Sequence, residues 1–223
     1  MSTIKITHYS DILCVWAYVS QRRIDELLKH FGDQVEIDFH FFAVFGDAHR
    51  KMVSNWQDKG GVKGYHKHVA SLAEDFPHLN IHPSLWVDPT PRSSLPGHLY
   101  LCAARLLEEQ GLIPKGSFRH FLKTVRHSFF CENRDISDTK VLRDIVEKSA
   151  LPTVQIMDTI ENGSAYAALS HDAQLSSSLA VHSSPTLIFN ENRQRLTGNV
   201  GYKIIEANVK ELLEEPIGGQ SWC

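Results

Sequence analysis

The chain has 223 residues, of which 42% are hydrophobic and 22% charged, so it can bury a sizeable core. Its formal charge of -3 gives no indication of a nucleic-acid partner or of an anionic membrane surface. The first residues lack the pattern of a signal peptide and no stretch is apolar enough to cross a membrane, so we expect a cytoplasmic protein.

The first 41 residues predict a β-α-β unit. Residues 3–9 alternate between apolar and polar side chains, which indicates a strand. After Asp11 the apolar residues recur at three- and four-residue steps until Gly32, which indicates a helix. A second alternating run covers residues 35–41. Strands joined through a helix pair in parallel with a right-handed crossover.

The middle of the chain predicts a block of helices. Residues 47–94 are irregular and rich in His, Trp, Gly and Pro, so we expect loops there with one helix near residues 65–75. From His98 onward the apolar spacing predicts five successive helices. The expected starts and ends of these helices are at Gly111, Ser117, Ser137 or Asp138, Pro152, Gly163 and Ser164. The fifth helix should run to about residue 179.

The end of the chain returns to strand spacing. Residues 186–190 form a short apolar run, residues 191–192 a turn and residues 194–197 a return strand, which together predict a hairpin. A closing helix should begin at Tyr202, and residues 216–223 look like a loose tail. The order predicts an α/β core of residues 1–45 and 179–215, with residues 46–178 as a helical insertion.

Cys14 lies between the first predicted strand and the first turn of the following helix. Free amides and the helix dipole favour a negative charge there, so this thiol should ionise more easily than a free one. The thiolate is the nucleophilic form of cysteine. A buried, inert cysteine is the alternative interpretation.

Pro185 is a second candidate, because it stands directly before the apolar strand that begins at Thr186. A proline at the first residue of a strand can be ordinary, or it can be a cis proline that frees backbone groups for a ligand. His182 is close in sequence, so it could stabilise a Cys14 thiolate by an ion pair, or it could be a surface residue.

Two segments carry a resemblance to a known family. YSDILCVWAY, residues 9–18, resembles the active-site loop of the DsbA-like thioredoxin family, and SSPTLIFN, residues 183–190, resembles its cis-proline loop. The likeness covers nearly the whole chain and is weakest over residues 47–94. It implies a thioredoxin-like core (β-α-β … β-β-α) with an inserted all-helical subdomain.

The resemblance also implies roles for individual residues. Cys14 matches the attacking cysteine and Pro185 the cis proline of that family. Ser184 would offer backbone groups to a bound peptide or to glutathione. Trp16 would lie in the exposed active-site turn, although a core aromatic is an equally good interpretation.

The chain departs from the dithiol members of the family at Ala17, where they have a second cysteine. A dithiol enzyme resolves its mixed disulfide with that second thiol. Here Cys102, Cys131 and Cys223 remain as candidate resolving thiols, and Cys102 falls on an apolar helix face that suggests packing. The scattered cysteines form no Cys-x-x-Cys pair, which suits a reducing compartment.

We therefore predict a thiol-disulfide oxidoreductase that acts through a single Cys14 thiolate and is resolved by an external thiol such as glutathione. The loop at Cys14 is also similar to that of kappa-class glutathione transferases and 2-hydroxychromene-2-carboxylate isomerases, which use serine at this position. A glutathione-dependent transferase or isomerase is therefore one alternative. A non-catalytic peptide- or ligand-binding protein is the other.

The expected partners are a small thiol or disulfide substrate, or a peptide in the cleft, and a homodimer is left open. We expect no tightly bound cofactor, with glutathione as a co-substrate. Thirteen histidines include the close pairs His66/His68 and His78/His82, but no acidic or cysteine partner completes a zinc pattern. We therefore predict no metal site.

Overall fold

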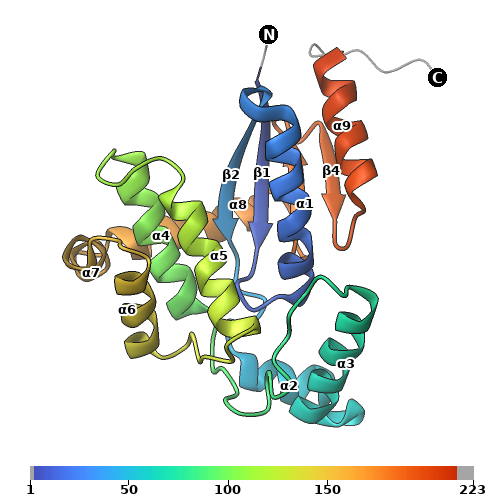
Figure 1. Ribbon diagram of the computed structural model, residues 1–223, viewed down its shortest axis with the longest axis vertical. Coiled ribbons are helices and arrows are strands. Elements are labelled where there is room, and N and C mark those ends of the chain that lie inside the picture. Colours follow the sequence, from blue (N-terminus) through green and yellow to red (C-terminus); the bar gives the residue numbers. More distant parts are fainter. Residues whose placement is uncertain (1–2, 215–223) are drawn as a thin grey trace. The chain divides into compact units, whose positions relative to one another are not determined.

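In the computed structural model, which describes residues 3–214, the chain begins with the predicted β-α-β unit (Figure 1). It consists of β1 (Ile4–Ser10), α1 (Val15–Phe31) and β2 (Val35–Phe41), with a short 3-10 turn at Gly32–Gln34 before β2. Gly32 has φ of 53°, a conformation that glycine adopts at little cost, and it ends α1.

A four-stranded sheet has the order β2-β1-β3-β4, where β3 is Thr186–Phe189 and β4 is Gln194–Thr197. The arrows of β1 and β2 point the same way in Figure 1. β3 is antiparallel to β1, with Ile6 opposite Phe189, and antiparallel to β4. The predicted hairpin and the α/β class are thus confirmed. Helix α9 (Tyr202–Glu214) contacts both α1 and β1.

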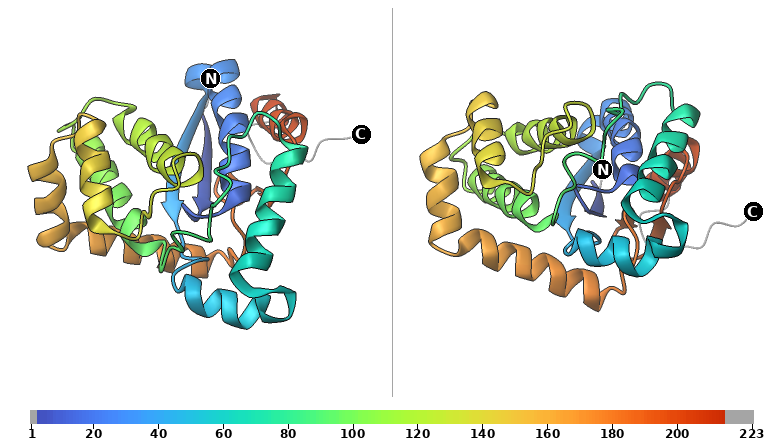
Figure 2. Two further views of the ribbon diagram at one scale, coloured as in Figure 1. Left: turned by 60° about the horizontal axis from the view of Figure 1, so that its bottom comes forward. Right: turned by 90° about the horizontal axis from the view of Figure 1, so that it is seen from below.

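Seven helices lie between β2 and β3. They are α2 (Ala48–Trp56), α3 (Gly61–Asp75), α4 (Leu95–Glu109), α5 (Ser117–Phe130), α6 (Thr139–Lys148), α7 (Thr153–Glu161) and α8 (Ser164–Ser178). Helix α4 contacts α5, α6 and α7, and residues 97–104 of α4 are all buried. α4 is therefore the central helix of this group. Figure 2 shows α8 as one continuous helix.

The structure corrects the prediction for residues 47–94. Helix α2 was expected to be loop, and α3 begins at Gly61 rather than near residue 65. Both helices bury few side chains, with Ala48 and Met52 buried in α2 and Tyr65 and Val69 in α3. Because so few positions are buried, the apolar residues show only a weak helical spacing in the sequence. This spacing is too weak to predict α2 or the start of α3.

Two helix caps also differ from expectation. Ser117 is the first helical residue of α5, and the cap is Gly116, whose φ is 92°. At the start of α8 the backbone N–H of Ser164 donates to the side chain of Asn162 at 2.9 Å. Asp138 is the cap of α6, as predicted, because its carboxylate accepts from the N–H of Lys140 at 2.8 Å.

The described chain forms two compact units. One contains residues 3–10, 14–40 and 176–214, and the other contains residues 11–13 and 41–175. The boundaries expected at residues 45 and 179 stay a prediction. The predicted loose tail, residues 216–223 with Cys223, lies outside the described residues. Within residues 3–214, no helix combines the length and the apolar character needed to span a membrane.

Candidate active site

Cys14 is the N-cap residue of α1, with an extended backbone at φ of -78° and ψ of 119°. Its carbonyl accepts the first hydrogen bond of the helix from the N–H of Tyr18 at 3.1 Å. The residue is 7% exposed, so Cys14 is buried. Cys14 therefore lies at the start of the helix, the position that the sequence predicted for it.

The thiol of Cys14 lies beside the Ser184–Pro185 segment, although 170 positions separate them in sequence. Its Sγ donates a hydrogen bond to the carbonyl oxygen of Ser184 at 3.3 Å. The Ser184–Pro185 peptide bond is cis. Two segments that were singled out separately in the sequence thus meet at one sulfur atom.

Two opposed influences act on the ionisation of this thiol. The N-terminus of α1 carries the positive end of the helix dipole, which stabilises a thiolate. The contact with the Ser184 carbonyl stabilises the protonated form, because a thiolate has no hydrogen to donate and is repelled by the oxygen. A reactive thiolate at Cys14 therefore has to give up this hydrogen bond.

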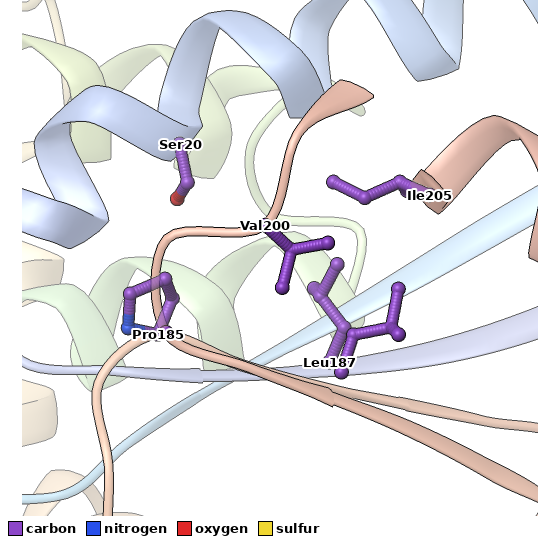
Figure 3. Close-up of a pocket in the computed structure, with 7 residues that line it drawn as sticks. Ser20, Pro185, Leu187, Val200 and Ile205 are labelled. Atoms are coloured by element: carbon purple, nitrogen blue, oxygen red, sulfur yellow. The ribbon is translucent and has the colours of Figure 1, made fainter. Parts of the chain in front are cut away.

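The loop around Pro185 is held by hydrogen bonds on both sides of the proline. The Pro185 carbonyl accepts from the N–H of Gly198 at 2.8 Å, and the Thr186 hydroxyl donates to the Ser183 carbonyl at 2.8 Å. The proline ring lines an apolar hollow (Figure 3). The other residues of the hollow are Ser20, Leu187, Leu196, Gly198, Val200 and Ile205.

The remaining predicted site residues differ in exposure. Trp16 and Ser184 are half-buried, and His182 is exposed. Ala17 is fully buried in the first turn of α1. The structure thus brings Cys14 to Ser184 and Pro185, whereas the roles of Trp16 and His182 in binding stay predictions.

The other described cysteines lie in different surroundings. Cys102 is fully buried in α4, and burial raises the pKa of its thiol to about 12. Such a thiol stays protonated at neutral pH, which supports packing as its role. Cys131 is half-buried at the end of α5, where its Sγ donates to the carbonyl of Asn80 at 2.9 Å.

A buried polar network lies directly before Cys14, and the sequence analysis did not predict it. The carboxylate of Asp11 accepts from the N–H of Leu13 at 2.8 Å through Oδ1. Its Oδ2 accepts from the N–H of Phe45 and from the Ser94 hydroxyl, both at 2.8 Å. Asp11 is fully buried. An Asp side chain often accepts a hydrogen bond from the backbone N–H two residues later in the chain. This local pattern could have indicated the contact between Asp11 and Leu13.

His98 belongs to the same network. Its Nε2 accepts a hydrogen bond from the N–H of Ile12 at 3.0 Å, and its ring stacks on Phe41 with centroids 5.2 Å apart. Burial lowers the pKa of His98, although the charge of nearby Asp11 acts in the opposite direction. An imidazole nitrogen can accept only when it carries no proton, so this geometry requires the neutral ring.

Within residues 3–214, no three His, Cys, Asp or Glu side chains are grouped so that they could hold a metal ion.

Over residues 8–214 the sequence matches the model of a family described as Thioredoxin. It is also similar to the ClpXP adapter protein SpxH from Bacillus licheniformis, with 33% identity over 107 residues. That stretch is 45% of this chain and 36% of SpxH, so the chain spans about a third of the length of this curated relative.

Solved structures with low sequence identity share the fold over almost the whole chain. One is described as a probable DsbA oxidoreductase from Streptomyces coelicolor, with 15% identity, a TM-score of 0.73 and coverage of 98% of this chain and 94% of that one. The cytosolic disulfide reductase DsbM from Pseudomonas aeruginosa with GSH has 15% identity, a TM-score of 0.64 and coverage of 96% and 98%. A 2-hydroxychromene-2-carboxylate isomerase has 12% identity, a TM-score of 0.68 and coverage of 95% and 97%.

Proposed function

Because the chain belongs to the thioredoxin family, we propose that it is a thiol-disulfide oxidoreductase that acts through the single thiol of Cys14. The observation that carries this proposal is the 3.3 Å contact between Cys14 Sγ at the start of α1 and the Ser184 carbonyl before Pro185. This contact brings a nucleophile, a helix N-terminus and a backbone acceptor together. Attack on a disulfide needs the thiolate form of this nucleophile, which the helix N-terminus favours.

The reaction has two exchange steps. The Cys14 thiolate attacks one sulfur of a substrate disulfide, so a Cys14 mixed disulfide forms and the other half of the substrate leaves as a thiolate. A second thiol then attacks the mixed disulfide and releases Cys14. The second thiol ends in a new disulfide with the half of the substrate that Cys14 held, so each turnover consumes one free thiol and releases one thiol from the substrate.

We propose that the second thiol is glutathione. Ala17 occupies the position of the second cysteine in dithiol enzymes, so α1 offers no resolving thiol of its own. Cys102 is fully buried, which removes it as a mobile resolver. A protein of the same fold, DsbM, has been solved with GSH, which supports glutathione as the co-substrate here. A cytoplasmic location, where glutathione is reduced, fits this proposal.

The test is reduction of a glutathionylated peptide with glutathione as the reductant. Wild-type protein should turn over, and mass spectrometry should find a glutathione adduct on Cys14. Cys14→Ser should abolish both, whereas the matched variant Cys131→Ser should retain them. Turnover that survives Cys14→Ser, or that is lost in Cys131→Ser, would refute the proposal.

The fold shared with a 2-hydroxychromene-2-carboxylate isomerase supports a second candidate, a glutathione-dependent isomerase or transferase. In that case glutathione is the bound nucleophile and Cys14 activates it without a mixed disulfide. Conversion of an aromatic or electrophilic substrate should then need glutathione and should partly survive Cys14→Ser, because a hydroxyl can also donate to a bound thiolate.

The 33% identity with an adapter protein supports a third candidate, a protein-binding role without turnover. Such a protein should show neither disulfide reduction nor conjugation. It should instead retain a peptide partner, and Cys14→Ser should leave that binding intact.

A further inference from the structure

Two buried side chains accept hydrogen bonds from the backbone amides of the short segment between β1 and Cys14. We propose that Asp11 and His98 are positioning residues for Cys14, because they fix the amides of Leu13 and Ile12 directly before it. This inference rests on the proposed function, since it concerns the thiol that the function uses.

Asp11 fixes the segment by connecting it to two other parts of the chain. Oδ1 accepts the amide hydrogen of Leu13, while Oδ2 accepts from the Phe45 amide and the Ser94 hydroxyl. Asp11 and Ser94 are both 0% exposed. Water does not reach such a site, so the loss of the carboxylate would leave buried donors without an acceptor.

His98 fixes the neighbouring amide in a different way. Its Nε2 accepts from Ile12 N–H, while Nδ1 has no hydrogen-bond partner among the described residues. The ring is 0% exposed and stacks on Phe41. A histidine that served packing alone would not need its nitrogen aimed at an amide. Among the described residues, the hydrogen bond that the His98 ring makes therefore holds the segment before Cys14.

The consequence for Cys14 follows from chain continuity. Cys14 needs an extended backbone to serve as the N-cap of α1, and its thiol depends on that position for the influence of the helix dipole. With the amides of Ile12 and Leu13 held, the backbone before Cys14 has one conformation. Without these acceptors the segment can rearrange to find other partners, and the thiol moves with it.

The experiment separates hydrogen bonding from packing by two substitutions at one position. His98→Phe keeps an aromatic ring against Phe41 but cannot accept from Ile12, whereas His98→Gln offers a carbonyl oxygen that can. Asp11→Asn is an independent third variant, and Asp144→Asn, which alters an exposed ion pair between α6 and Arg134, is the matched control. Circular dichroism and thermal melting establish that each variant folds.

The first readout is the pH midpoint of Cys14 alkylation by iodoacetamide, measured in protein that carries Cys131→Ser and Cys223→Ser so that these two competing thiols are removed. We expect the midpoint to rise in His98→Phe and Asp11→Asn and to stay at the wild-type value in His98→Gln and Asp144→Asn. The second readout is disulfide reduction, where kcat/KM should fall about tenfold to a hundredfold in His98→Phe, with rescue by His98→Gln.

An unchanged midpoint in both folded variants, His98→Phe and Asp11→Asn, would overturn the proposal. Failure of both to fold would assign the pair to stability alone and would overturn it as well. If wild-type protein reduces no disulfide, the proposed function fails, yet the alkylation midpoints still decide whether Asp11 and His98 position the thiol. The two failures are therefore distinguishable.

Discussion

Replacement of Asp172 by alanine should destabilise the protein severely. The carboxylate is 0% exposed and accepts from the Phe41 amide at 2.9 Å. It also forms two hydrogen bonds with the guanidinium of Arg105, at 3.0 and 2.9 Å, and the Arg105 side chain is only 13% exposed. Loss of the carboxylate leaves the nearly buried guanidinium of Arg105 and the buried amide of Phe41 without this acceptor. Removal of one partner of such a pair costs about 3–5 kcal/mol, so the free energy of unfolding should fall by about that amount.

Urea unfolding followed by circular dichroism measures the loss. The matched control is Asp144→Ala, because Asp144 is 39% exposed beside Lys148 and Arg134, and exposed pairs contribute at most about 1 kcal/mol. The double variant Asp172→Leu with Arg105→Met should recover much of the stability, since apolar side chains of similar size can replace a buried pair. A loss below about 1 kcal/mol in Asp172→Ala would refute the reasoning.

Two further predictions concern the thiol site and acid stability. Ala17→Cys should supply a resolving thiol, so that the reduced variant reduces one equivalent of substrate disulfide without glutathione and ends with an internal disulfide to Cys14 that lowers its mass by two hydrogens; a mixed disulfide on Cys14 that persists until glutathione is added would argue against a resolving role for this position. The hydrogen bond from Lys210 lowers the pKa of Glu206. Glu206 therefore stabilises the fold above its unfolded pKa, and this contribution is lost as the pH falls through the lower folded pKa. Melting temperatures should therefore converge for wild type and Glu206→Gln at low pH, and a constant difference down to about pH 2 would contradict this.

Much of the core was predictable because its elements carry strong local periods. α1 buries a recurring set of apolar side chains, residues 4–8 of β1 alternate between buried and less buried positions, and the apolar run of β3 is buried at all four residues. The turn at residues 191–192 lies between β3 and β4, where turn chemistry in the sequence placed it. Local patterns of this kind need no knowledge of distant contacts, so a single sequence is enough to read them.

The polar network before Cys14 was not predictable for the opposite reason. The contact between Ile12 and His98 joins residues 86 positions apart, and that of Phe45 with Asp11 joins residues 34 apart. The neighbours of His98 in α4 are all buried. The sequence around it therefore shows no regular spacing of buried and exposed positions from which the role of His98 could be read. Only the fold shows which amide a buried acceptor faces, and hydrogen-bond pairing at long range leaves no periodic trace in one chain.

The ionisation of Cys14 illustrates why position along the sequence is not sufficient to predict reactivity. The start of a helix favours the thiolate, and this part was visible in the sequence. The Ser184 carbonyl at 3.3 Å favours the thiol, and this part depends on a segment 170 positions away. Because the second influence requires the sulfur to keep its proton, a substrate group that donates to the Ser184 carbonyl would displace the thiol and remove the opposition. The alkylation midpoint of Cys14 therefore reports the balance of both influences, and a free-cysteine midpoint would mean that the carbonyl offsets the helix.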